Sequence, residues 1–172
     1  MYAIGEAVVY GKRGVCVVKD IGRLNMPGID RDRMYYTLRP MFAAETIYTP
    51  VDTPVFMRRV ITREQALALI AQIPAIEGGL GLQPEMSGRE MPEYYRGLLE
   101  THECADLVRL IVTVYARTQK AAQQKKKLRQ TDQNFMRDAE NILYGELSVA
   151  LDIPKEQVPD FIRRQIGRQA ET

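Results

Sequence analysis

The 172-residue chain is poor in the side chains from which catalytic and metal centres are built. It has no tryptophan, one histidine, His102, and two cysteines, Cys16 and Cys104, which lie in different halves of the chain. One His and one nearby Cys fall short of the three or four ligands that zinc takes, and two distant cysteines do not make a disulfide framework. Glu100 and Glu103 are close to His102 in sequence, but these residues do not share one helical face as a metal site requires. We therefore expect no enzyme, no cofactor, no metal and two reduced thiols.

Other chemical signatures are missing as well. The sequence contains no nucleophile elbow, P-loop or paired-carboxylate motif, and no strand precedes Gly79-x-Gly81 as a dinucleotide fingerprint requires. No apolar run approaches membrane-spanning length, and Met1 is followed by strand-like sequence instead of the basic and apolar regions of a signal peptide. These absences predict a cytoplasmic protein with no small-molecule substrate and no membrane partner.

The net charge is only +2, but the positive charge is concentrated in one part of the chain. Eight basic residues and one acidic residue, Asp132, lie in the segment 109–137. The basic residues are Arg109, Arg117, Lys120, Lys125, Lys126, Lys127, Arg129 and Arg137. Such a run can bind nucleic-acid phosphates, or it can complement the negative end of a helix dipole and keep the surface hydrated. Charge alone leaves both interpretations open.

Residues 1–61 have the pattern of a small sheet. In Ile4 to Ile21, IGEAVVYGKRGVCVVKDI, apolar residues alternate in two short runs on either side of a glycine-bounded reversal, which predicts a β-hairpin. Further strands are expected at 34–38, 46–51 and 55–61, and the strand 46–51 is expected at an edge because Pro50 cannot donate a ladder hydrogen bond. Five short strands without an intervening helix predict a twisted antiparallel sheet or partly open barrel.

Helical periods begin after this sheet. Thr62 and Gln65 have the spacing of a capping box, and they open a predicted helix at 62–74 that Pro74 is expected to end. A glycine-rich linker is predicted at 75–90, and an all-α helical bundle at 91–172. The predicted fold class is therefore α+β, with the domain boundary in the linker.

Three segments of the chain carry a resemblance to a known family. The opening IGEAVVYGKRG resembles that of the CarD family of bacterial RNA polymerase-binding regulators, and it is similar to the polymerase-interacting domain of the transcription-repair coupling factor. In the helical half, MPEYYRGLLE and LRQTDQNFMRDAENILYGEL resemble the family's DNA-facing helix and a stretch ending in Leu-x-x-Glu-Leu. The resemblance implies a Tudor-like sheet domain followed by a helical DNA-binding domain.

The resemblance implies that the sheet binds the β subunit of RNA polymerase by pairing an exposed strand with it, as in β-augmentation. The matching edge is AETIYTPVD, and the residues expected at this contact are Arg23, Ile47, Tyr48, Thr49 and Pro50. From the residues alone, an ordinary edge strand protected by Pro50 and nearby charge explains the pattern equally well.

The helical domain is expected to bind promoter DNA through the minor groove and the backbone, without sequence preference. The residues expected there are Met91, Tyr94, Arg96, Lys125, Lys126, Lys127 and Arg129. The family places a tryptophan wedge at the position of Met91, and an apolar methionine or Tyr94 can substitute for it in kinked DNA. Packing within the helical domain is the alternative role for both residues.

These observations predict a non-enzymatic transcription regulator. It would bridge the polymerase β subunit and promoter DNA and bind the open complex more tightly than the closed one, which shifts the equilibrium between them. The alternative is a protein-interaction adaptor, on RNA polymerase or another partner, with little or no DNA binding.

Overall fold

The computed structural model describes residues 1–79 and 86–170 and divides the chain into two units, Met1–Ile61 and Thr62–Thr172. The first unit contains the strands and the second contains the α-helices, so the predicted α+β class is confirmed. Each unit is described separately below.

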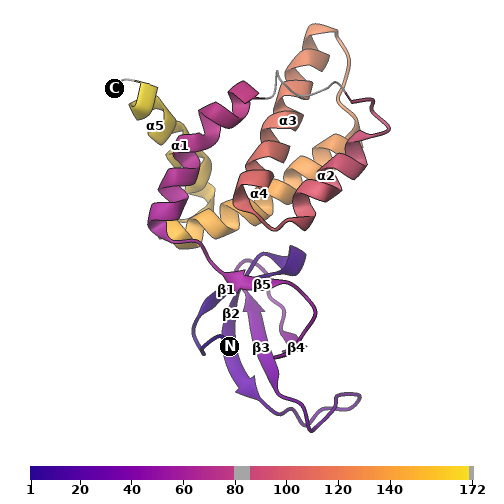
Figure 1. Ribbon diagram of the computed structural model, residues 1–172, viewed down its shortest axis with the longest axis vertical. Helices are drawn as coiled ribbons and strands as arrows, with labels where there is room; N and C mark the ends of the chain where they lie inside the picture. Colours follow the sequence, from indigo (N-terminus) through magenta and orange to yellow (C-terminus); the bar gives the residue numbers. More distant parts are fainter. Residues whose placement is uncertain (80–85, 171–172) are drawn as a thin grey trace. The chain divides into compact units, whose positions relative to one another are not determined.

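The first unit is an open, five-stranded antiparallel sheet (Figure 1). Its strands are β1 (Ala7–Tyr10), β2 (Val15–Gly22), β3 (Tyr35–Pro40), β4 (Ile47–Pro50) and β5 (Met57–Arg59), and a 3₁₀ turn, η1 (Gly11–Arg13), joins the first two. The spatial order is β4-β3-β2-β1-β5. The predicted hairpin and the edge position of the strand around Pro50 are both confirmed.

One face of this sheet forms a small apolar core. The pairing of Val8 with Cys16 places Cys16 and Val18, and not Val15 or Val17, on the same face as Val8. The fully or nearly fully buried members of the core are Val8, Cys16, Val18, Tyr36 and Leu38. Burial raises the pKa of the Cys16 thiol to about 11, so this thiol is protonated and unreactive at neutral pH.

The second unit consists of α-helices that pack against one another (Figure 1). They are α1 (Arg63–Gly79), α2 (Met91–Glu100), α3 (Cys104–Gln123), α4 (Gln130–Leu151) and α5 (Val158–Ala170), with a 3₁₀ turn, η3 (Lys155–Gln157), before the last. Helix α4 contacts each of the other four, and α2 packs on both α3 and α4. Within residues 1–79 and 86–170, no helix is long and apolar enough to cross a membrane.

The start of α1 follows the sequence pattern, whereas its end does not. The Thr62 N–H donates to Gln65 Oε1 at 2.8 Å and the Gln65 N–H donates to Thr62 Oγ1 at 3.1 Å, so the predicted capping box is confirmed. The expectation that Pro74 ends the helix is wrong, because α1 continues through it to Gly79. A proline inside a helix costs about 3 kcal/mol. Burial of Leu69, Ile70 and Ile73 on the same helix, at about 1.5–3 kcal/mol each, more than offsets this cost.

The division between the units consequently lies nearer the N-terminus than the glycine-rich stretch. Helix α1 packs on α3, α4 and α5, so it belongs to the helical unit and the division falls between Ile61 and Thr62. Of the predicted linker 75–90, residues 75–79 are helical and 88–90 form a turn before α2. The remainder, 80–85, lies outside the described residues.

Candidate functional site

The outer edge of β4 has hydrogen-bonding groups that point away from the sheet. In the register of β3 and β4, Thr37 faces Tyr48, and the Val51 N–H donates to the Met34 carbonyl at 3.0 Å. Bonding and non-bonding pairs alternate in an antiparallel ladder, so residues 47, 49 and 51 bond to β3. The N–H and C=O of Tyr48 therefore point outward, as does the C=O of Pro50, which accepts the Thr53 N–H at 3.0 Å.

The side chains of β4 are divided between the two faces of the sheet. Ile47 packs against the apolar core, and Thr49 is buried and accepts a hydrogen bond from the Tyr10 hydroxyl at 3.2 Å. Tyr48 projects to the other face and is 41% exposed. Of the residues predicted to bind the polymerase, Tyr48 and Pro50 can therefore offer their side chains at this edge, while Ile47 and Thr49 chiefly hold the strand in place.

Arg23 lies two strands away from this edge. It is exposed and directly follows Gly22, the last residue of β2. Gly22 pairs with Tyr35 of β3, and Tyr35 pairs with Pro50 of β4. The sheet thus places Arg23 at the same end as Pro50 but across β3.

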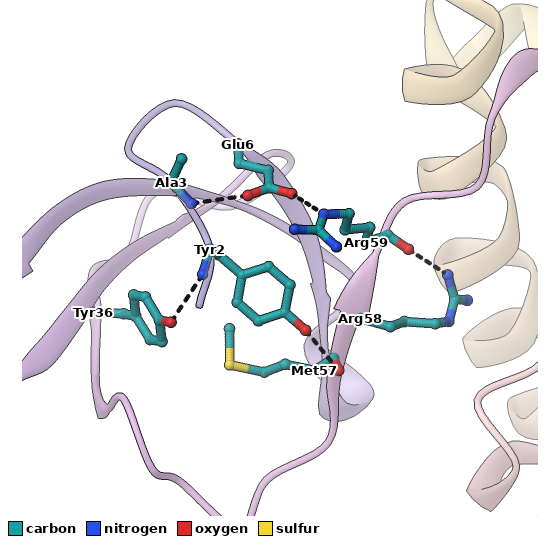
Figure 2. A network of polar contacts seen from close by, with 7 residues as sticks. All are labelled: Tyr2, Ala3, Glu6, Tyr36, Met57, Arg58 and Arg59. Atoms are coloured by element: carbon teal, nitrogen blue, oxygen red, sulfur yellow. Dashed lines mark hydrogen bonds and ion pairs between the residues drawn. The ribbon is translucent and has the colours of Figure 1, made fainter.

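The opposite edge, β5, is covered by side chains. The Gly11 N–H donates to the Phe56 carbonyl, so the same alternation turns the carbonyls of Met57 and Arg59 outward. The Met57 carbonyl accepts the Tyr2 hydroxyl at 3.0 Å, and the Arg59 carbonyl accepts the Arg58 guanidinium at 3.1 Å (Figure 2). Both outward acceptors of β5 are therefore occupied, as expected of an edge protected from pairing.

The N-terminal segment is fixed in this position by further polar contacts. The Tyr2 N–H donates to the Tyr36 hydroxyl, and Figure 2 shows the Tyr2 ring beside Arg59, whose guanidinium lies 5.6 Å from the ring centroid. Glu6 accepts hydrogen bonds from the Ala3 N–H and from Arg59 Nε, at 2.8 and 2.6 Å. These two bonds lower the pKa of the Glu6 carboxyl, the Ala3 bond more than the Arg59 bond.

In the helical unit, a buried polar network joins the helices that carry the predicted DNA-binding residues. The Tyr95 hydroxyl of α2 donates to Asp132 Oδ1 of α4 at 2.8 Å, and Arg117 Nε of α3 lies 3.8 Å from the same oxygen. Tyr95 and Asp132 are buried, and the Tyr95 ring also packs on Phe135 with centroids 5.2 Å apart. Because Asp132 lies in the first turn of α4, the helix dipole stabilises its negative charge.

The predicted DNA wedge is not at the surface. Met91 is only 4% exposed and packs in the core as the first residue of α2, so its DNA contact, which stays a prediction, would require the side chain to leave the core. An apolar side chain at a helix start gains more from burial than from exposure to water, and the sequence pattern does not distinguish the two environments. Tyr94 is half-buried, with its ring 6.1 Å from that of Tyr95.

Two of the predicted basic residues, Arg96 and Arg129, lie on the helices that this network joins. Arg96 is exposed, and its guanidinium lies 5.9 Å from the centre of the Phe135 ring, which links it to α4. Lys125, Lys126, Lys127 and Arg129 are exposed in the connection between α3 and α4, and Arg129 is the N-cap of α4. The structure therefore brings Arg96 and Arg129 to the packed pair α2 and α4, although they are distant in sequence.

Comparison with known families identifies the first unit. Residues 2–61 match the family model described as the CarD-like/TRCF RID domain. The sheet is similar to the CarD-like RID domain and is named the RID domain for this similarity. No curated protein matches the chain.

The RID domain ends where the first structural unit ends, at Ile61. The predicted resemblance to the CarD family is thereby confirmed for this unit, and the match supports an interaction with RNA polymerase. The two edges of the RID domain differ in that β5 has its outward carbonyls covered by Tyr2 and Arg58, while β4 presents Tyr48. Neither covering residue was expected from the sequence, because the cover depends on the register of β5.

Proposed function

We propose that this protein is a non-enzymatic transcription regulator of the cytoplasm that adds a strand of the RNA polymerase β subunit to β4. The observation that carries the proposal is the difference between the two edges of the RID domain: the outward carbonyls of β5 are occupied, and Tyr48 of β4 is exposed. In β-augmentation, main-chain hydrogen bonds supply affinity and alternate side chains supply selectivity. Tyr48 would supply both kinds of contact.

The register limits how a partner strand can bind. A strand beside β4 can exchange two hydrogen bonds with Tyr48. It receives no N–H from Pro50, whose carbonyl already accepts the Thr53 N–H at 3.0 Å. Arg23, at the same end of the sheet, would contact an acidic or polar group of the partner.

We further propose that the helical unit contacts promoter DNA through phosphates. The supporting observations are the exposed positions of Arg96, Lys125, Lys126, Lys127 and Arg129 and the packing of α2 on α4 beside them. Phosphate contacts carry no sequence preference. They would increase the affinity for any polymerase complex in which the DNA backbone lies within reach of the helical unit. Tighter binding to the open complex would lengthen its lifetime.

The test compares proline substitutions at the two sheet edges. Tyr48→Pro removes an outward N–H from β4 without removing a bond to β3. Arg59→Pro removes the corresponding outward N–H at β5, together with the guanidinium that contacts Glu6 and the Tyr2 ring. We expect Tyr48→Pro to weaken binding of the full-length protein to purified RNA polymerase by about tenfold or more, since one hydrogen bond and its neighbours are lost. Arg59→Pro should bind as the wild type does.

Two further variants separate the side chain from the backbone. Tyr48→Ala tests the exposed ring, and Tyr48→Phe tests the hydroxyl alone. Ile47→Glu is unsuitable, because Ile47 packs against the core and the change would destabilise the sheet. Equal binding by the wild type and a folded Tyr48→Pro variant would refute docking at β4.

One observation favours a second candidate function. The burial of Met91 removes the apolar wedge, so a protein-interaction adaptor with little DNA binding explains the helical unit as well. Salt separates the candidates: phosphate contacts make the logarithm of affinity fall steeply with the logarithm of salt concentration, and apolar protein contacts do not.

A further inference from the structure

Gly88 lies in the turn before α2, directly against the side chain of Arg129. A Cβ atom built on Gly88 would be 2.6 Å from Arg129 Nη1, 2.7 Å from Cζ and 2.9 Å from Nη2. All three distances are shorter than real carbon contacts, so only glycine leaves room for the guanidinium there.

The backbone of Arg129 is also held in place. As the N-cap of α4 it has an extended conformation, with φ −64° and ψ 145°, and its carbonyl accepts the Gln133 N–H at 3.3 Å. Preceding it, α3 ends in two bonds that fold the chain back: Lys126 N–H to the Ala121 carbonyl at 2.8 Å and Lys125 N–H to the Ala122 carbonyl at 3.1 Å. The backbone of Arg129 is thus restrained, its guanidinium lies directly against Gly88, and the residue remains exposed.

We propose that Gly88 is a positioning residue, whose bare Cα holds the Arg129 guanidinium against the turn before α2 and so preorders it for a DNA phosphate. The inference rests on the proposed DNA contact of the helical unit. Arginine has many rotamers in water, and a guanidinium that is already held loses less conformational entropy when a phosphate binds.

Gly88→Ala is an informative variant because the fold can accept it. The φ angle of Gly88 is outside the left-handed region, and the atoms that a methyl group meets belong to the far end of a flexible side chain. Arg129 would move away, and the helical unit should keep or slightly raise its stability, since alanine reduces the entropy of the unfolded chain. Gly167→Ala in α5, where a Cβ meets nothing within 4 Å, is the matched control.

The experiment measures affinity of the full-length protein for fluorescent duplex DNA by anisotropy over a series of salt concentrations. Arg129→Ala should lower the slope of log affinity against log salt by about 0.9, the contribution of one phosphate in duplex DNA. Gly88→Ala should lower the slope in the same direction and weaken binding by about twofold to tenfold, the effect of freeing one ordered side chain. The double variant should bind no more weakly than Arg129→Ala alone, and Gly167→Ala should match the wild type.

The outcomes separate the two proposals. If Arg129→Ala lowers the slope but Gly88→Ala leaves it unchanged, or if the two changes add fully, Gly88 has no positioning role and the DNA contact stands. If the wild type shows no salt-dependent DNA binding, the DNA part of the proposed function and this inference both fail. A melting temperature measured for each variant identifies any loss of binding that follows from unfolding.

Discussion

Removing the Tyr95 hydroxyl should destabilise the helical unit by a predictable amount. In Tyr95→Phe, Asp132 loses a buried donor at 2.8 Å and keeps Arg117, whose Nε is 3.8 Å away. Hydrogen bonds to charged groups contribute about 1.5–3 kcal/mol, so we expect the free energy of unfolding to fall by that amount. The ring contact with Phe135 is retained, because phenylalanine has the same shape.

Asp132→Ala should cost more than Tyr95→Phe. It leaves the Tyr95 hydroxyl and the Arg117 guanidinium without their acceptor, and Arg117 Nε is already buried without a hydrogen bond in the described part of the chain. Removing one partner of a fully buried charged pair costs about 3–5 kcal/mol, and we expect the lower end, about 3 kcal/mol, because the Arg117 side chain is 32% exposed. Once Asp132 is gone, the hydroxyl has no partner to lose, so the double variant should be less destabilised than the sum of the two single variants.

The assay is urea unfolding followed by circular dichroism at the helical band, which reports mainly on the second unit. All three variants and the wild type are fitted for the midpoint and the slope, and only midpoint shifts at constant slope are interpreted as stability changes. Additive effects of Tyr95→Phe and Asp132→Ala would refute the reasoning, because independent sites add and hydrogen-bonded partners do not.

Two further predictions concern the same unit. Lys125 has a left-handed φ of 55° at the end of α3, a conformation that glycine adopts without strain, so Lys125→Gly should raise the free energy of unfolding by about 0.5–1 kcal/mol in the same urea assay. Burial, and then the bond to Asp132, raise the pKa of Tyr95, and burial also raises the pKa of Tyr144. The stability that the two protonated tyrosines contribute is complete below pH 10, the ordinary tyrosine pKa. It is lost as the pH rises toward the folded-state pKa of each tyrosine. Each tyrosine should make the free energy of unfolding fall more steeply with pH, by up to about 1.4 kcal/mol per pH unit. The free energy of unfolding of Tyr95→Phe, measured from pH 9 upward, should therefore fall less steeply than that of the wild type. An unchanged dependence on pH would contradict the raised pKa of Tyr95.

Local sequence signals predicted the elements they control. The capping box of Thr62 and Gln65 and the hairpin around Gly11 to Gly14 depend on residues close in sequence, and both formed as expected. The prediction that Pro74 ends α1 was wrong because the packing of α1 on three other helices outweighs the local cost of the proline. No local sequence pattern indicates this packing.

The candidate sites depend more on pairing and packing than on residue type. Which backbone groups of β4 and β5 face outward follows from the register of each strand, and a shift by one residue would exchange the inward and outward sets. The contact between the Arg129 guanidinium and Gly88 joins residues far apart in the chain, so the glycine-rich stretch alone did not indicate this contact. The sequence singled out Tyr48, Arg96 and Arg129, whose binding roles stay predictions, but it did not indicate the residues that place or cover them.

The burial of Met91 changes how the helical unit could act on DNA. A wedge must leave the protein core before it enters a base step, and moving a methionine of this kind into water costs about 1.5–3 kcal/mol, in addition to a few kcal/mol for unstacking. Arg96 and Arg129 require no such rearrangement, because both are exposed and each is already held by a neighbour, Phe135 or Gly88. A regulator built in this way would stabilise promoter DNA through charge alone. Its effect on the open complex should therefore diminish with salt as steeply as its DNA affinity does, whereas an apolar wedge would retain part of its effect at high salt.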